Sequence, residues 1–527
     1  MVLTPALASA MLAFTPFASA ALYDQVIQTN NGPVQGYAAF NSTPTGGLTH
    51  WKDITVWKGI PFAATTAGEN RFRAPQPASS WNETLDARSW GNVCPSATSG
   101  SDYTIDEDCL NLNIWSAANS TNAKLPVVMW SYPAGSTAAD SLFDGGGIAD
   151  KGIVYVNYNY RTGSFGWLAT PELSAEFAKE SGSTSSGNWG VLDQIAAVKW
   201  IHKNIAAFGG DPDQITVMGQ SAGSAATQHI LNSPLTKGLI KGAIIESGVR
   251  DPRDPLCSSL AENYLTLEAA EAQGKKYLAS LNVSTITEMR ALPQSDLITG
   301  LALFGSSSEF QFTATLDHYA IPDTYWNTLK KGLAHDVPVI TGNTKDENGA
   351  TYGLNISMTT YLSDLNSTFS GEWPQKFLAA YPAHDSTTAS GAYNSQFTDR
   401  SKVGTWFWAR LWASARTSPV YTYIWDHAPP GGQGAPHESE INYVHNNLYA
   451  TDKDWTKTDY AVAQKMNSYW VNFIKTGNPN GGGLAQWYPA NVTQTVQHVG
   501  NGWGPIPIAS KSKVALFKAW FSTLHKY

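Results

Sequence analysis

Charged residues are scarce in this 527-residue sequence, and their scarcity excludes several classes of protein. Only 14% of the residues are charged, compared with roughly 25% in average soluble chains, and no run of five or more like charges occurs. The 34 basic and 42 acidic residues give a net charge of −8, whereas a nucleic-acid partner requires a basic face. We therefore expect no nucleic-acid partner.

Long apolar segments are almost absent, which limits how the protein can meet a membrane. Beyond the N-terminus, no segment is apolar enough to span a bilayer. The first 20 residues are uncharged and end in Ala18-Ser19-Ala20, a small-x-small pattern typical of signal-peptide cleavage, while Pro5 and Pro16 interrupt their apolar run. We expect residues 1–20 to be a signal peptide and the mature protein to be secreted, extracellular and without a stable membrane anchor.

Seven Asn-x-Ser/Thr sequons fit a eukaryotic secretory route, because this tripeptide is the acceptor for N-linked glycans. Some such tripeptides arise by chance in a chain rich in Asn and Ser, so they are candidates for glycosylation. They lie at Asn41, Asn82, Asn119, Asn282, Asn355, Asn366 and Asn491.

Cysteine is limited to Cys94, Cys109 and Cys257. In an oxidising compartment the first two, 15 residues apart, are expected to form a disulfide, which stabilises the fold by roughly 3 kcal/mol in the chain-entropy model. Cys257 is then unpaired, and we expect a buried small hydrophobe rather than a reactive thiol. Since no His/Cys cluster has the spacing of metal ligands, we expect neither a metal nor another cofactor.

The sequence does contain enough apolar residues for a large core. Hydrophobic residues make up 42% and aromatic residues 12%, which excludes a disordered or fibrous protein, and without repeats or linkers residues 21–527 are expected to form a single domain. Apolar runs at 126–130 and 152–157 are typical of buried strands, and 192–208 has the spacing of an amphipathic helix. Strands that alternate with helices predict an α/β fold with a large, mostly parallel central sheet and helices on both faces.

One motif points to chemistry. Gly219-Gln220-Ser221-Ala222-Gly223 follows a short apolar strand at 215–218 and leads into a helical stretch at 225–231. In this strand-turn-helix context the G-x-S-x-G pattern is typical of a strained turn that holds the serine hydroxyl above the edge of a sheet. Serine alone is a poor nucleophile, so a histidine must take its proton and a carboxylate must orient that histidine.

The partners of Ser221 are expected downstream, because this architecture has the chain order Ser, acid, His. Asp346 and Glu347 follow a predicted strand at 337–341, and His437 lies in a Gly/Pro-rich loop at 429–440. Spacing alone leaves Asp346 open as the acid. The other histidines that spacing leaves open as the base are His427 and His445.

Several motifs occur in one order between residues 29 and 480, and together they resemble a known family. Among them are Glu107-Asp-Cys-Leu-Asn-Leu-Asn-Ile-Trp115, Phe208-Gly-Gly-Asp-Pro212, the 219–223 motif and His437-Glu-Ser-Glu-Ile441; the others lie at 94, 157–161, 187–194 and 346–347. In this order they are similar to the type-B carboxylesterase/cholinesterase/lipase family of α/β-hydrolases, and the resemblance leads us to expect a secreted eukaryotic, fungal-like member.

The resemblance implies the α/β-hydrolase fold and a serine carboxylic ester hydrolase. It assigns Ser221 as the nucleophile that forms an acyl-enzyme, Glu347 as the acid and His437 as the base. The disulfide that it implies joins Cys94 and Cys109. The residues that it places behind the histidine are Ser247 and Glu440.

The resemblance also implies a backbone oxyanion hole, and here the sequence departs from the family. The usual Gly-Gly-Gly run is Pro133-Ala134-Gly135. The implied donors, the N–H groups of Ala134, Gly135 and Ala222, are all retained, and one such donor is typically worth about 3 to 4 kcal/mol. Because Pro133 fixes φ and Ala134 does not easily adopt φ > 0, we expect a stiffer loop than a triple glycine.

Two features bear on the ester. The 94–109 loop has no Trp and Gln220 is neutral, so a quaternary-ammonium site is not expected. The same loop is short and polar, unlike the amphipathic lid of interfacial lipases. We expect an esterase for small or soluble esters; the alternatives are a lipase or sterol esterase and, less favoured because the triad is intact, a non-catalytic binding module.

Overall fold

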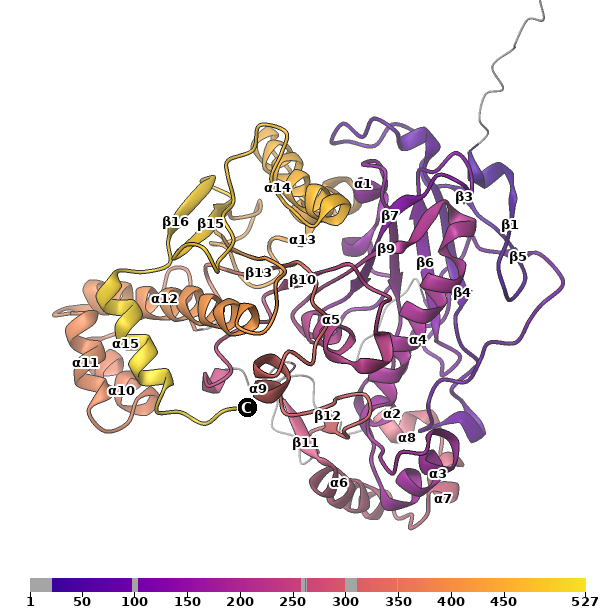
Figure 1. Ribbon diagram of the computed structural model, residues 1–527, viewed down its shortest axis with the longest axis horizontal. Coiled ribbons are helices and arrows are strands. Elements are labelled where there is room, and N and C mark those ends of the chain that lie inside the picture. The colour runs from indigo at the N-terminus through magenta and orange to yellow at the C-terminus, as the bar shows by residue number, and fades with distance from the viewer. Residues whose placement is uncertain (1–20, 97–102, 257–260, 262, 299–309, 348) are drawn as a thin grey trace, which may run out of the picture.

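The computed structural model describes residues 21–96, 103–256, 261, 263–298, 310–347 and 349–527. An 11-stranded sheet crosses these residues, with helices on both faces (Figure 1). Two sequence predictions, the signal peptide at 1–20 and the free thiol at Cys257, lie outside the described residues.

The central sheet is mostly parallel, as predicted. All strands from β15 to β8 run parallel, and the antiparallel pairs lie towards the two edges. In spatial order the strands are β16 (Gly504–Pro507), β15 (Thr495–Val499), β14 (Val420–Trp425), β13 (Val339–Thr344), β10 (Gly242–Glu246), β9 (Gly210–Gln220), β7 (Leu125–Ser131), β8 (Val154–Tyr158), β6 (Asn111–Ser116), β4 (Thr55–Pro61) and β3 (Tyr37–Ala38). The smaller sheets contain β1 (Val26–Gln28), β2 (Pro33–Gln35), β5 (Leu85–Asp86), β11 (Tyr264–Thr266) and β12 (Ala314–Leu316).

The central strands are buried on both faces. Every residue of β6, β8, β10, β13 and β14 is buried, which explains why β8, β10 and β14 are rich in apolar and β-branched residues. In β6 the polar residues Asn111, Asn113 and Ser116 are buried as well. The predicted strands at 126–130 and 152–157 correspond to β7 and β8. The predicted strand at 215–218 is the centre of the longer β9.

Two helices flank β9. The predicted helix at 192–208 is α4 (Trp189–Asn204) followed by a 3₁₀ turn at Ile205–Phe208, and α5 (Ala222–Asn232) begins directly after the 219–221 turn. In Figure 1, α4 and α5 lie on one face of the sheet, and α1 (Gly146–Ala149) and α14 (Lys457–Thr476) on the other. The remaining helices are α2 (Gly163–Trp167), α3 (Pro171–Ser181), α6 (Leu267–Ser280), α7 (Ile286–Arg290), α8 (Gln294–Ile298), α9 (Tyr325–Lys330), α10 (Met358–Thr368), α11 (Trp373–Ala380), α12 (Ser386–Ala413), α13 (Ile441–His445) and α15 (Lys511–Phe521).

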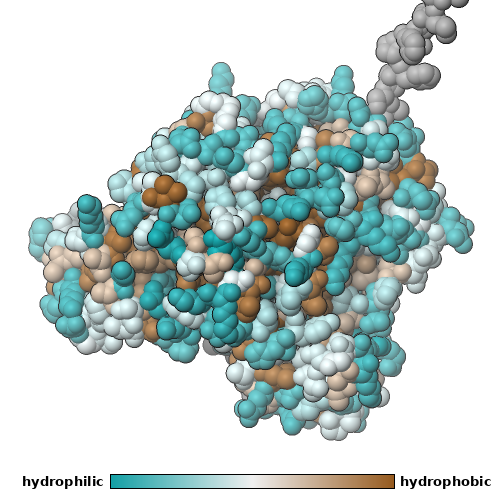
Figure 2. Space-filling view, in the orientation of Figure 1, coloured by the Kyte–Doolittle hydropathy of each residue, from teal (hydrophilic) through white to brown (hydrophobic). Residues whose placement is uncertain are grey.

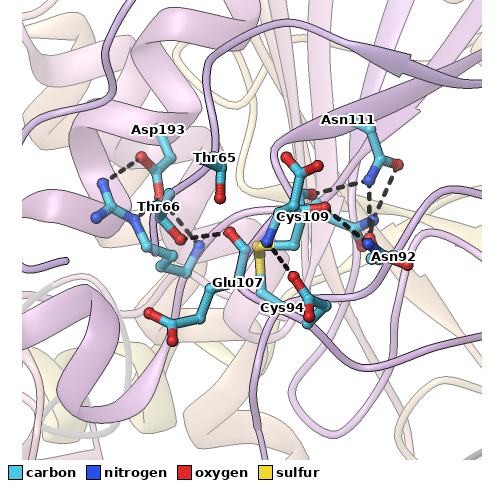
Figure 3. The surroundings of a disulfide bond; sticks show 12 residues. Thr65, Thr66, Asn92, Cys94, Glu107, Cys109, Asn111 and Asp193 are labelled. Atoms are coloured by element: carbon cyan, nitrogen blue, oxygen red, sulfur yellow. Dashed lines mark hydrogen bonds and ion pairs between the residues drawn. A yellow bond between two sulfur atoms is a disulfide. The ribbon is translucent and has the colours of Figure 1, made fainter. Parts of the chain in front are cut away.

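A disulfide joins Cys94 and Cys109, both of which are buried (Figure 3). Close to it, the buried carboxylate of Glu107 accepts a hydrogen bond from Arg71 Nε at 2.8 Å. Arg71 Nη1 also donates to the carbonyl of Arg290, the last residue of α7, at 2.9 Å. The disulfide loop is therefore fastened to the α7 region by a buried ion pair, whose desolvated charges are compensated by hydrogen bonds.

The surface is largely polar, with scattered apolar side chains (Figure 2). No helix of the described segments is long and apolar enough to cross a membrane. The asparagines of all seven sequons are exposed. The large hydrophobic side chains that are exposed are Val26, Leu333, Tyr352, Leu362, Tyr488 and Val492.

Candidate active site

Ser221 lies in a strained turn between β9 and α5. Its φ of 55° and ψ of −120° are outside the regions that a residue with a side chain ordinarily adopts. A Cβ on Gly219 would lie 2.2 Å from the carbonyl oxygen of Gly223, and one on Gly223 would lie 1.9 Å from that of Ser131. Only glycine at both positions allows β7, β9 and α5 to approach this closely, so the G-x-S-x-G spacing has a steric cause.

The strand register brings other residues to the same edge as Ser221. Glu246, the last residue of β10, pairs with Gln220, the last residue of β9, and with Gly342 of β13. The Ser221 N–H donates to the Glu246 carbonyl at 3.0 Å. Residues that follow these parallel strands therefore meet at the carboxyl edge of the sheet.

The structure pairs Glu347 with His437. Glu347 follows β13, and the Thr344 N–H donates to its Oε1 at 2.8 Å. The other carboxylate oxygen, Oε2, lies 2.5 Å from His437 Nδ1. The Glu347 side chain is buried, while the His437 side chain is 41% exposed. The imidazole is therefore the part of the pair that a ligand can reach. With Nδ1 donating to the carboxylate, Nε2 is the nitrogen left to accept a proton.

The alternatives that spacing left open are occupied elsewhere. The Asp346 carboxylate accepts from the Ala435 N–H at 2.7 Å. His427 bonds through Nε2 to Asp459 at 2.9 Å. His445 is fully buried, and its Nδ1 donates to the Ile441 carbonyl at 2.9 Å. None of the three is bonded to the Glu347–His437 pair among the described residues.

Gln220 brings the Ser221 turn against the histidine. Its amide nitrogen lies 3.4 Å from both Nδ1 and Nε2 of His437, and its side chain is fully buried. No hydrogen bond joins Ser221 Oγ to His437 within the described chain; hydrogen bonds of this kind often tighten only when substrate binds. The neutrality of Gln220 is evident from the sequence, but its contact with the imidazole ring is not.

The Pro133–Ser136 segment is a tight turn in which the Ser136 N–H donates to the Pro133 carbonyl at 3.3 Å. Gly135 carries the positive φ, 82°, and Ala134 does not, so the left-handed position falls on the residue that tolerates it. Tyr132, just before the turn, stacks on Tyr160 at 5.0 Å between ring centroids. That the loop is stiffer than a triple glycine stays a prediction.

The three backbone N–H groups that the sequence predicts as oxyanion donors make no hydrogen bond among the described residues. The turn residues Ala134 and Gly135 are exposed, and Ala222 is the first residue of α5, where helical N–H groups have no partner within the helix. The three N–H groups can therefore bind an anion without losing an existing bond.

Two buried glutamates lie behind the histidine. Ser247 Oγ donates to Glu440 Oε1 at 3.4 Å, and Trp470 Nε1 donates to Glu246 Oε1 at 2.7 Å. Burial raises the pKa of Glu440 well above its ordinary value and that of Glu246 to about 8, so burial favours the neutral form of both carboxyl groups. Sequence analysis missed Glu246; the available signal was a charged residue ending the apolar strand at 242–246.

The charge on Glu347 favours protonation of His437. Burial disfavours the charged imidazolium, but the hydrogen bond and the charge of Glu347 outweigh burial and raise the pKa of His437 to about 9. Within the described ranges, no group of three or more His, Cys, Asp or Glu side chains could hold a metal ion.

Known proteins share this architecture. The model of the carboxylesterase family matches residues 23–502. The chain is 32% identical over 463 residues to the fumonisin B1 esterase of Sphingopyxis macrogoltabida, covering 82% of this chain and 81% of that protein. It is 30% identical over 492 residues to the bile salt-activated lipase of Bos taurus, with 83% and 78% covered. A solved structure of PNB esterase is similar with a TM-score of 0.72 and 27% identity, covering 94% of this chain and 99% of that one.

Proposed function

Because this chain belongs to the carboxylesterase family and is a carboxylic ester hydrolase, we propose that Ser221, Glu347 and His437 are its catalytic triad. The observation that carries the proposal is the 2.5 Å contact between His437 Nδ1 and Glu347 Oε2, beside the strained Ser221 turn. A short-chain chromogenic ester tests it: the protein should hydrolyse the ester, and a serine-directed organophosphate should abolish hydrolysis. Persistence of turnover after full inhibitor labelling would exclude a serine nucleophile.

The geometry supports a two-step acyl transfer. Ser221 Oγ attacks the ester carbonyl while His437 Nε2 takes the hydroxyl proton, and Glu347 stabilises the imidazolium that forms. The N–H groups of Ala134, Gly135 and Ala222 bind the oxyanion of the tetrahedral intermediate. His437 then protonates the departing alcohol, leaving an acyl-enzyme on Ser221, which water hydrolyses with the same histidine as base.

We assign Ser247 and Glu440 to support of the histidine. Ser247 orients the buried Glu440 carboxyl group, and burial, by favouring the neutral form of Glu440, limits the negative charge that Glu440 adds beside His437. A second ionised carboxylate at this place would hold the proton on the imidazole and slow the base.

The pH dependence follows from the His437–Glu347 pair. His437 must be neutral to accept the Ser221 proton, and its pKa is raised towards about 9, so kcat/KM is lost as the pH falls through that pKa. We expect the loss to follow the ionisation of His437, with a midpoint between about 7 and 9, above the ordinary imidazole value of about 6.5. Initial rates at low substrate concentration measure this midpoint. A kcat/KM that is constant from pH 5 to 8 would contradict a histidine base.

The substrates we propose are small or soluble esters. The disulfide loop is short, with Cys94 and Cys109 separated by 15 positions in sequence, and Gln220 beside the nucleophile carries no charge to hold a cation. Residues 97–102 of this loop lie outside the described residues. The second candidate is a lipase or sterol esterase for long-chain esters, which the 30% identity to bile salt-activated lipase favours.

Substrate form separates these candidates. A lid that opens at an interface makes activity rise abruptly at the solubility limit, because the interface shifts the closed and open populations. Without such a lid, the rate on tributyrin should follow a smooth saturation curve through that limit, with short acyl chains preferred. A jump at the onset of emulsion, or a preference for acyl chains of roughly twelve carbons or more, would favour the lipase.

We also propose that the protein is secreted. Residues 1–20 act as a cleaved signal peptide, residues 21–527 form one secreted domain, and the seven sequons are accessible because their asparagines are exposed. The N-terminal sequence and the glycosidase-sensitive mass of protein from the culture medium test this. Retention of residues 1–20 would exclude cleavage.

A further inference from the structure

Asp346 joins the loops that carry Glu347 and His437 by two hydrogen bonds to Ala435. The Asp346 N–H donates to the Ala435 carbonyl at 3.0 Å, and the Asp346 Oδ2 accepts from the Ala435 N–H at 2.7 Å. Asp346 also forms an isolated parallel bridge with Pro436. Asp346, which precedes Glu347, is thus bound through its backbone and its side chain to Ala435. Ala435 lies two positions before His437.

The Asp346–Ala435 contact fixes the end of the 426–434 loop, which leaves the sheet after β14. The pairing of β13 with β14 ends at Thr344 and Trp425, and the Lys345 N–H still donates to the Trp425 carbonyl at 2.8 Å. Residues 426–434 then run without helix or strand. Asp346 holds the returning end at Ala435, so the position of the following residues depends on this contact.

Gly434 is shaped to receive the Asp346 carboxylate. Its φ is 70°, and a Cβ at this position would lie 2.4 Å from Asp346 Oδ2 and 2.6 Å from Tyr352 Cβ. Any side chain would be strained by the backbone and would also displace the carboxylate. The glycine therefore belongs to the same contact as Asp346.

We propose that Asp346 is a positioning residue that sets the Glu347–His437 contact, acting as a hydrogen-bond acceptor for the Ala435 N–H. The inference rests on the triad proposed above. Asp346 makes no bond to His437 among the described residues, so it takes no part in proton transfer. An amide oxygen can accept the same bond, and an alanine cannot.

The chain offers a matched control at the opposite ends of the same two strands. Asp336 precedes β13, and its carboxylate accepts from the N–H groups of Thr417 at 3.0 Å and Ser418 at 2.9 Å, just before β14. Asp336 thus links the segments that precede β13 and β14, as Asp346 links the segments that follow them. The Asp336 contact lies at the amino edge of the sheet. Its loss should affect stability without affecting the triad.

The experiment compares Asp346→Ala, Asp346→Asn, Gly434→Ala and Asp336→Ala in kcat, KM and Tm on a chromogenic short-chain ester. We expect Asp346→Ala to lower kcat by about 10- to 100-fold, because small misplacements of catalytic groups have effects of this size, with KM within about threefold of wild type. Asp346→Asn should restore kcat to within about threefold, and Gly434→Ala should resemble Asp346→Ala. Asp336→Ala should lower Tm as Asp346→Ala does and keep kcat within about twofold.

Equal kcat values for Asp346→Ala and Asp336→Ala would overturn the inference. So would an Asp346→Asn variant as slow as Asp346→Ala, because the charge of Asp346 would then matter and not its role as a hydrogen-bond acceptor. If Asp346→Ala does not fold, Gly434→Ala against Asp336→Ala decides in the same way. Ser221→Ala in the same assay separates this inference from the triad. An active Ser221→Ala removes the triad, whereas an inactive Ser221→Ala beside a fully active Asp346→Ala removes only the role of Asp346.

Discussion

Replacing Ser221 by alanine is expected to lower kcat by about four to six orders of magnitude, the range seen when a nucleophile that works as part of a triad is removed. Folding should be unaffected, because the hydroxyl is half-buried and donates no hydrogen bond among the described residues. Single-turnover and steady-state rates on a chromogenic ester, with Tm alongside, measure both effects.

Ser233→Ala is the control for this substitution, because Ser233 caps the opposite end of the same helix α5. It should retain wild-type turnover. If Ser221→Ala keeps even a tenth of the wild-type kcat, Ser221 is not the nucleophile.

The second large effect is expected for Glu347→Gln, which should lower kcat by about three to four orders of magnitude. The amide retains the shape of the carboxylate but carries no charge to stabilise the imidazolium, and its N–H can impose the wrong tautomer on His437. Asp346→Asn, one residue earlier, should cost no more than about threefold, since the amide oxygen still accepts from Ala435. Steady-state kcat for the two variants gives the ranking, and the reverse ranking would mean that Asp346 is the acid.

The nucleophile turn could be predicted from local sequence because its cause is local. Two glycines flank Ser221 at positions where any side chain would meet backbone atoms, and an apolar strand precedes them. The parallel α/β sheet was predictable for a similar reason, since the buried strands are continuous apolar runs. The strand ends were less certain, and β9 begins at Gly210, five residues before the predicted run.

The acid could not be chosen from spacing, because Asp346 and Glu347 follow the same strand and either side chain could reach a histidine. The family resemblance favoured Glu347, and the structure pairs it with His437. The choice depends on the register of β13 against β14, which places the Ala435 N–H, and not the imidazole, against Asp346. The pairing of residues that are 81 positions apart in sequence leaves no local pattern.

The same limit applies to the contacts that sequence analysis missed. The Gln220 amide lies against His437 and the buried Glu246 lies behind it only because β9, β10 and the 426–440 loop end at one edge of the sheet. Pro133-Ala134-Gly135 was recognised as a departure from triple glycine, but only the structure shows that the positive φ falls on Gly135.

The most direct test of the triad is to find the residue that reacts. A chromogenic organophosphate should inactivate the protein with one leaving group released per active site, and peptide mapping by mass spectrometry should find the phosphoryl adduct on Ser221. The Ser221→Ala protein should acquire no adduct under the same conditions. An adduct on another residue, or full activity in protein whose Ser221 is completely labelled, would contradict the mechanism.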